Sequence, residues 1–168
     1  FRLFRDVNFD QFSYVAIADQ DDIWTLDKLS HAINCMQKKQ CEGYSSDLIA
    51  FDINRKCSWY LQKSDNEQEL DYMFQGASAG CTYVISKNAA QLVKTKLIIN
   101  QEHCNVRLSH DWLIYAICRS YGMSWFQDRD SRIFYRQHRS NAYGALPGIN
   151  GIIEKEKKVH SGWYRNHV

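Results

Sequence analysis

The sequence lacks the features that mark membrane and secreted proteins. No apolar run approaches the roughly 20 residues that a membrane-spanning helix needs, and the charged residues Arg2, Arg5 and Asp6 exclude the apolar core of a signal peptide at this position. Proline is nearly absent as well. The single proline, Pro147, lies in a glycine-containing stretch, 143–151, that we expect to be a mobile loop. These absences favour a cytoplasmic protein.

The cysteine spacing and the charge balance exclude two further classes. Six cysteines are present, but none forms a C-x-x-C pair, and their spacings fit no zinc ribbon or finger. Several lie in apolar runs, which is typical of buried free thiols in a reducing cytosol. The net charge is only +2, and the densest basic stretch, 155–158, is typical of a solvated helix face. The sequence therefore predicts no nucleic-acid partner.

What the chain does contain is an alternation of strand-like and helix-like segments. Apolar runs predict strands at 12–18, 48–51, 81–85, 123–126 and 132–136. Helical spacing predicts helices at 25–39, at 88–97, from 109 to Gly122, and from about 150 onward. With 45% hydrophobic residues, 168 residues suffice for one domain, 1–168, with a buried core. This order predicts an α/β fold with a mixed, mostly parallel sheet flanked by helices.

The helix predicted at 25–39 has an apolar face and charges that suit its dipole. Asp22 or Thr25 is the predicted cap at its start, and lysines occupy its last turn. The residues expected to face the core are Leu26, Leu29, Ile33 and Met36.

Three carboxylates follow the first predicted strand, in the stretch ADQDDIW at 18–24. In an extended backbone Asp19 and Asp21 share a face and repel each other unless a cation compensates, while Asp22 points elsewhere. Mg²⁺ or Mn²⁺ prefers such oxygen ligands, and ligands bind beyond the carboxyl ends of strands in α/β sheets. A polar loop whose carboxylates cap a helix is the alternative, and the spacing alone does not decide between the two.

Three other segments combine residue types that carry chemistry. Asp111 lies at a predicted helix start, where the dipole favours the ionised carboxylate that a general base needs. A plain helix cap is the alternative. Arg136 and His138 follow a short strand and are candidate phosphate and metal ligands, or ordinary surface residues. The small residues at 75–80 permit the close approach of an acceptor, or simply a tight turn.

Taken in order, these segments resemble the family-2 glycosyltransferases of the GT-A fold, most closely the bacterial rhamnosyltransferase-like members that build surface polysaccharides. The matching stretches are DQDDIW at 19–24 with Lys28-Leu29, GASAG-CTYVIS at 76–86, HDW at 110–112, and YRQH at 135–138 with Asn141 and Gly144. The resemblance implies a GT-A-like fold that is N-terminally incomplete, because relatives begin with a strand and loop that seat the nucleotide base.

The resemblance also implies a role for each matched residue. Asp19 and Asp21 would be the D-x-D pair that holds a divalent metal, Mg²⁺ or Mn²⁺, with His138 approaching from the C-terminal side. Asp111 would be the catalytic base. The substrate-binding residues that it implies are Asp22, Trp24, His110, Trp112 and Arg136.

The implied reaction is an inverting transfer of a sugar, such as rhamnose, from a nucleotide-sugar donor to a hydroxyl of a saccharide or lipid-linked saccharide acceptor. A lipid-linked acceptor is compatible with peripheral association at the inner face of the membrane. The alternative is a non-catalytic or truncated remnant that still binds carbohydrate or nucleotide sugar. A nucleotidyltransferase would need a glycine-rich phosphate loop, which is missing. A metal phosphohydrolase built on His110, Asp111 and His31 would need a mainly helical fold, which the strand-like runs argue against.

Overall fold

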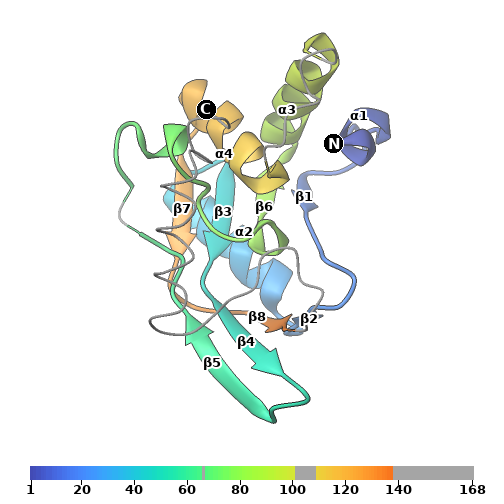
Figure 1. The fold of residues 1–168 in the computed structure, drawn as a ribbon. Helices are drawn as coiled ribbons and strands as arrows, with labels where there is room; N and C mark the ends of the chain where they lie inside the picture. Colours follow the sequence, from blue (N-terminus) through green and yellow to red (C-terminus); the bar gives the residue numbers. More distant parts are fainter. Residues whose placement is uncertain (66, 101–108, 138–168) are drawn as a thin grey trace, which may run out of the picture.

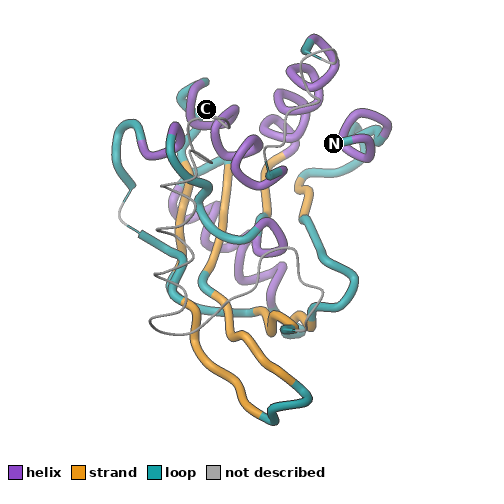
Figure 2. The backbone as a smooth tube through the Cα atoms, viewed as in Figure 1, coloured by secondary structure: helices purple, strands orange, loops and turns teal. Residues whose placement is uncertain are grey.

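The computed structural model describes residues 1–65, 67–100 and 109–137 (Figures 1 and 2). Its helices are α1 (Arg2–Asp6), α2 (Lys28–Lys39), α3 (Lys87–Ile99) and α4 (His110–Ser120), with short 3₁₀ helices η1 (Asp71–Met73) and η2 (Gly80–Thr82). Its strands are β1 (Tyr14–Ala16), β2 (Ile23–Trp24), β3 (Gly43–Ser46), β4 (Leu48–Asp52), β5 (Cys57–Leu61), β6 (Val84–Ser86), β7 (Trp125–Asp128) and β8 (Ile133–Arg136). The predicted loop at 143–151 and the predicted helix from about 150 lie outside the described residues.

The strands form two four-stranded sheets that share continuous stretches of backbone. The upper sheet in Figure 1 has the order β1-β6-β3-β7, and the lower sheet has the order β2-β8-β4-β5. β3 continues into β4 across Asp47, and β7 continues into β8 across 129–132, so both pairs pass from the upper sheet to the lower. Among the described strands, β3–β7 and β4–β8 pair in parallel, and the other four pairings are antiparallel.

Asp47 lies between the end of β3 and the start of β4, and its carboxylate is buried. Its Oδ1 accepts hydrogen bonds from the backbone N–H groups of Lys63 (2.6 Å) and Ser64 (2.5 Å). Its Oδ2 accepts from the Ser64 hydroxyl (3.0 Å) and the Tyr60 hydroxyl. The Asp47 N–H donates to the Asp128 carbonyl at the end of β7 (2.9 Å). A buried carboxylate is stable only when its oxygens are so occupied, and here the bonds fix the joint between the sheets.

The predicted α/β class, with a mixed sheet flanked by helices, is confirmed. Successive side chains of the upper sheet point to opposite faces: Val84 packs with α2, whereas Ile85 packs with α3 and α4. The parallel share is smaller than expected, because β4 and β5 are joined by a short turn, which makes them antiparallel. The strand predicted at 12–18 is shorter in the structure, and it is half-buried because β1 lies at a sheet edge.

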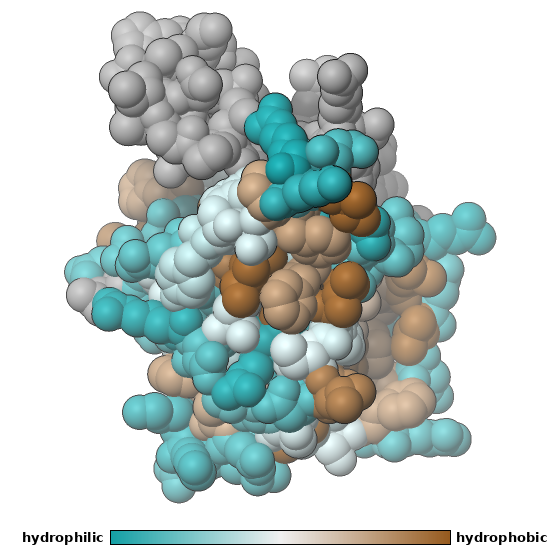
Figure 3. Space-filling model, turned by 90° about the horizontal axis from the view of Figure 1, so that it is seen from below, coloured by the Kyte–Doolittle hydropathy of each residue, from teal (hydrophilic) through white to brown (hydrophobic). Residues whose placement is uncertain are grey.

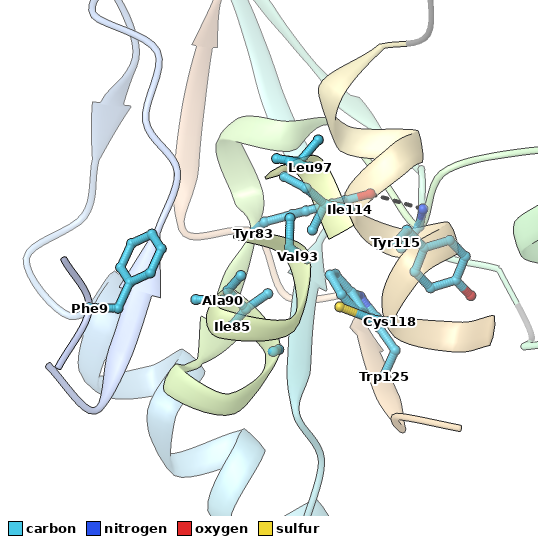
Figure 4. Packing of buried hydrophobic residues seen from close by; sticks show 12 residues of the cluster. Phe9, Tyr83, Ile85, Ala90, Val93, Leu97, Ile114, Tyr115, Cys118 and Trp125 are labelled. Carbon is cyan, nitrogen blue, oxygen red and sulfur yellow. Dashed lines mark hydrogen bonds between the residues drawn. The ribbon is translucent and has the colours of Figure 1, made fainter. Parts of the chain in front are cut away.

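The largest hydrophobic cluster lies between the upper sheet and helices α3 and α4 (Figure 4). Helix α3 contributes Ala89, Ala90, Val93 and Leu97, the spacing expected of one helical face, and Ser86 caps its start by accepting from the Ala89 N–H (3.1 Å). The Tyr83 hydroxyl is buried in this cluster and accepts a hydrogen bond from the Ala77 N–H (3.0 Å), drawn as the dashed line in Figure 4. The helices predicted at 88–97 and from 109 are confirmed as α3 and α4.

Helix α2 differs from its prediction in both its start and its buried face. It begins at Lys28 with Asp27 as its N-cap residue, so the predicted caps at Asp22 and Thr25 are wrong. Leu26 precedes the helix and is fully exposed, and Leu29 is 42% exposed. The reason is that residues 23 and 24 pair as β2 with β8 before the helix begins. The helix therefore starts later in the chain, and different residues face the core. The buried residues are Lys28, Ala32 and Met36.

Gly43 is the position where the upper sheet has no room for a side chain. It pairs with Trp125, and a Cβ at residue 43 would lie 2.1 Å from the Trp125 ring. That ring is buried edge-on between Tyr83 and Tyr115. We therefore expect Gly43→Ala to lower the free energy of unfolding by about 1–3 kcal/mol, the usual effect of overpacking. Urea denaturation measures this loss. Ser58→Ala, on the exposed strand β5, is the control, with an expected change within about 0.5 kcal/mol.

The end of the molecule that carries the lower sheet is turned toward the viewer in Figure 3. Apolar side chains gather near the middle of this face and hydrophilic residues surround them. Among the exposed apolar residues of these strands, Ile23 on β2 pairs with Phe134 on β8. Within the described part of the chain, no helix has the length and apolarity to cross a bilayer.

Candidate active site

The acidic turn, residues 19–22, connects the two sheets on the side where β1 ends and β2 begins. The backbone turns at Gln20 and Asp21, so the alternation of an extended chain no longer applies. Asp19 comes close to Asp22 in this turn. Carboxylate oxygens of Asp19 and Asp22 and the Cys81 sulfur all lie within 4.8 Å of one another.

Asp22 is the carboxylate of this turn that contacts the end of β8. Its Oδ1 accepts a hydrogen bond from the Arg136 N–H (3.1 Å), whereas its buried Oδ2 accepts none among the described residues. Burial raises the pKa of Asp22, the neighbouring Cys81 thiol and the Arg136 N–H oppose that rise, and the negative charges of Asp19 and Asp21 add to it. A cation bound here would offset the repulsion between these carboxylates, and the Asp22 Oδ2 is an oxygen that could bind it.

Lys28 places a buried amine next to this carboxylate. Its side chain is only 2% exposed, and its Nζ lies 3.9 Å from the centre of the Trp24 ring. The Nζ has no hydrogen-bond partner among the described residues. Burial lowers the pKa of Lys28 to about 8, although the negative charge of Asp22 opposes that change. The ammonium group and the Asp22 carboxylate are thus two polar groups without full partners in one buried region.

Arg136, at the end of β8, reaches the acidic turn. In addition to its N–H bond to Asp22, its Nε donates to the Asp21 carbonyl (3.0 Å). Its guanidinium group lies 5.2 Å from the Phe51 ring centre. His138, the predicted metal ligand two residues further on, lies outside the described residues.

Asp111 lies in the first turn of α4 and is held there by its neighbours. Its Oδ1 accepts from the Ser109 hydroxyl and from the Trp112 N–H (2.8 Å). His110 is exposed, whereas Trp112 is buried, and the Trp112 Nε1–H donates to the Tyr72 carbonyl (2.8 Å). The predicted cluster is therefore an oriented carboxylate at a helix start, with a buried indole behind it.

Two consecutive residues, Gly80 and Cys81, contact both clusters. A Cβ at Gly80 would lie 2.6 Å from the His110 Nε2 and 3.1 Å from the Asp111 Cβ. The Cys81 sulfur lies beside the carboxylates of Asp19 and Asp22. The small-residue segment at 75–80 therefore brings the start of α4 against the chain that lines the acidic turn, and the absence of a side chain at residue 80 permits this contact.

Comparison with known proteins found one similar curated sequence. No protein-family model matches the sequence. Over all 168 of its residues, however, the chain is 34% identical to the dTDP-rhamnosyl transferase RfbG of Shigella flexneri. This chain is similar to a rhamnosyl transferase. It spans 58% of the length of that relative. The similarity supports a glycosyltransferase of the rhamnosyltransferase kind.

Two residues of this candidate site were missed as functional candidates. Lys28 was noted only as part of the resemblance, although its spacing from Ala32 and Met36 places it on the buried helix face. Cys81 was interpreted as a buried thiol, which is correct, but its neighbours are carboxylates. The helical period was therefore an available signal for Lys28. No local sequence pattern predicts the contact between Cys81 and the acidic turn, because the two lie far apart in the sequence.

Proposed function

We propose that this chain is the catalytic part of a metal-dependent, inverting glycosyltransferase that moves a sugar, such as rhamnose, from a dTDP-linked donor to a hydroxyl of a saccharide acceptor. The observation that carries the proposal is the contact of Gly80 with Asp111 and of Cys81 with Asp19 and Asp22. This places a candidate base and a candidate metal-binding turn on either side of one short segment. The 34% identity to a dTDP-rhamnosyl transferase supports the choice of donor.

The residues of the acidic turn fit a hard divalent cation. Asp19 and Asp22 would hold Mg²⁺ or Mn²⁺, with Asp21 next to them, because the buried Asp22 Oδ2 accepts no hydrogen bond from the part of the chain that the structure describes and the carboxylates repel one another. Burial and the charge of Asp22 raise the pKa of the neighbouring Cys81 thiol, and because hard divalent ions prefer oxygen to sulfur, the proposed donors are oxygens. Such an ion, when bound, neutralises charge on the leaving diphosphate.

Two cationic side chains of the chain itself complement this turn. Lys28 and Arg136 would neutralise the remaining phosphate charge, Lys28 as a buried ammonium and Arg136 as a planar donor. Trp24, whose ring stacks against Lys28, would line the donor pocket. A donor diphosphate would also give the Lys28 Nζ the hydrogen-bond acceptor that it lacks among the described residues.

Asp111 would act as the base on the acceptor side. Its carboxylate would accept the proton of the acceptor hydroxyl as that oxygen forms a bond to the anomeric carbon, while the bond to the diphosphate breaks on the opposite face. The Ser109 hydroxyl and the Trp112 N–H donate to the Asp111 Oδ1 and hold the carboxylate at the start of α4. His110, exposed beside it, would contact the acceptor, and Trp112 would support the wall of the pocket from behind.

The proposed acceptor is a saccharide of a surface polysaccharide, free or lipid-linked. A lipid-linked acceptor would require the enzyme to work at the inner face of the membrane through peripheral association. A transfer assay that compares the free saccharide with the lipid-linked saccharide distinguishes the two acceptors.

The metal assignment predicts a specific ranking of alanine variants. Asp19→Ala and Asp22→Ala are each expected to lower Mn²⁺ affinity about tenfold or more, the scale of one charged contact of about 1.5–3 kcal/mol. Asp21→Ala is expected to have a smaller effect, because its carboxylate is not part of the close group. Isothermal titration calorimetry with Mn²⁺ measures the ranking, and Asp6→Ala, an exposed residue of α1, is the control. A larger loss for Asp21→Ala than for Asp22→Ala would restore the pairing predicted from the sequence.

The decisive test of the function is transfer from dTDP-rhamnose to saccharide acceptors with Mn²⁺ present and after its chelation. Metal-dependent release of dTDP together with glycosylated acceptor is expected. Donor binding without transfer would favour the alternative of a non-catalytic remnant. Absence of both donor binding and transfer would refute the proposal for this chain.

A further inference from the structure

A second group of metal-ligating side chains joins α2 to the end of β7, apart from the residues used above. His31 and Cys35 lie four residues apart on α2 and therefore share a face, and Asp128 is the last residue of β7. The His31 Nε2 lies 2.8 Å from the Asp128 Oδ2. The Cys35 sulfur lies 3.6 Å from that same nitrogen and 3.9 Å from that same oxygen. Nitrogen, sulfur and oxygen thus form a compact triangle.

The geometry of this triangle does not fit a catalytic triad. In a nucleophile–His–Asp triad the carboxylate binds Nδ1 and leaves Nε2 for the nucleophile. Here Cys35 and Asp128 both approach the Nε2 of His31. Three ligand atoms that converge in this way face a common point, as they do around a metal ion.

One of the three distances matches what a tetrahedral zinc ion requires, and the other two differ from it by about 0.5 Å or less. Zinc binds nitrogen at about 2.0–2.1 Å, sulfur at about 2.3 Å and oxygen at about 2.0–2.2 Å, which places the ligand atoms about 3.3–3.6 Å apart. Both distances from the Cys35 sulfur are near this range. The distance between His31 and Asp128 would need to lengthen by only about 0.5 Å to meet it.

The surroundings orient the ligands and leave them accessible. The buried Tyr44 hydroxyl donates to the Asp128 Oδ2 (3.0 Å), and the Asp130 N–H donates to its Oδ1 (3.0 Å). Such outer hydrogen bonds fix the carboxylate and are typical of metal sites. The side chains of His31 and Asp128 are 25% and 13% exposed, so an ion and a further small ligand can enter from solvent.

We propose that His31, Cys35 and Asp128 bind Zn²⁺, with a fourth position open to water or a small ligand. The mixture of imidazole, thiol and carboxylate favours zinc over the hard ions proposed for the acidic turn. The bound ion would attach α2, which carries Lys28 at its start, to the end of β7, where the chain passes to the lower sheet. This proposal does not depend on the proposed transferase function, because it concerns other residues and another metal.

Cobalt titration of the metal-free 168-residue chain tests the site. Co²⁺ bound by a thiolate in tetrahedral geometry gives a charge-transfer band in the near ultraviolet, and one equivalent of Zn²⁺ is expected to abolish it. Zn²⁺ is also expected to raise the Tm, because it binds only the folded state. Cys35→Ser should remove the band, and His31→Gln should weaken binding. Tyr44→Phe should keep the band but lower the affinity by roughly 10- to 100-fold, the effect of losing an outer hydrogen bond.

Two other cysteines provide matched controls for this titration. Cys57→Ser replaces an exposed thiol, and Cys81→Ser replaces the thiol next to Asp19 and Asp22. Both variants are expected to keep the band. Loss of the band in Cys81→Ser, with its retention in Cys35→Ser, would move the ion to the acidic turn and overturn the proposal. Absence of any thiolate band in the unmodified chain would overturn it as well.

Discussion

Asp111→Asn is expected to lower the rate of sugar transfer by about 10²–10⁴-fold, the usual contribution of a general base. The asparagine Oδ1 can still accept from Ser109 and from the Trp112 N–H, so the start of α4 should keep its structure. The amide cannot take up the proton of the acceptor hydroxyl. We therefore expect kcat to fall while the affinity for donor and Mn²⁺ stays within about twofold of the unmodified chain, since neither is assigned to Asp111.

The measurement for Asp111 pairs a transfer assay with calorimetry of donor binding. Asp6→Asn removes an exposed carboxylate from α1, whose partner is Arg2, and should transfer sugar at the unmodified rate. Near-normal turnover in Asp111→Asn would remove this residue from the role of base. A loss of donor binding equal to the loss of rate would instead make Asp111 a binding residue.

Lys28→Met is expected to make the protein more stable and less able to bind its donor. The pKa of Lys28 falls from 10.5 to about 8 on folding, mainly through burial. One pKa unit corresponds to about 1.36 kcal/mol, so the charged amine costs the folded state roughly 3 kcal/mol near pH 7. Methionine fills the same space without that cost. It also removes the ammonium proposed to contact the diphosphate, which should weaken donor binding roughly 10- to 100-fold, the value of one charged hydrogen bond.

The pH dependence of unfolding tests the burial of Lys28 separately from function. Between pH 8 and pH 10.5 the unfolded chain holds a proton on this residue that the folded chain has released. Stability should therefore rise with pH across that window, and Lys28→Met should lack the rise attributable to this group. Lys38→Met, on an exposed position of the same helix, is the matched control and should keep it. A less stable Lys28→Met protein at pH 7 would show that the ammonium is well compensated in the fold.

Local periodicity was sufficient to predict the elements that have clear faces. Helices α3 and α4 follow from apolar residues three and four apart, and β4 and β8 from short apolar runs. The meeting of Arg136 with the acidic turn followed from the family resemblance. The strands β2, β3 and β5 were not predicted. β2 has only two residues, and β3, although wholly buried, consists of Gly43, Tyr44, Ser45 and Ser46, which lack an apolar pattern.

The details of the site depend on contacts that no local pattern encodes. The pairing of Asp19 with Asp22 depends on a turn at Gln20 and Asp21 that interrupts the extended backbone. The burial of Lys28 depends on where α2 starts, which the pairing of β2 with β8 decides. The contact of Gly80 with Asp111 joins residues far apart in the chain. The sequence was sufficient to propose the carboxylates of the site. Which residues they contact depends on tertiary packing.

The joint at Asp47 has a consequence for how the two halves of the site are spaced. The acidic turn and Arg136 belong to strands of the lower sheet or lead into them, whereas Asp111 travels with α4, which packs on the upper sheet. If the proposed function holds, the distance between the acceptor oxygen at Asp111 and the diphosphate at the acidic turn would depend on the angle between the two sheets. Asp47, whose carboxylate fixes the joint between the sheets, would then influence this distance without contacting the substrate.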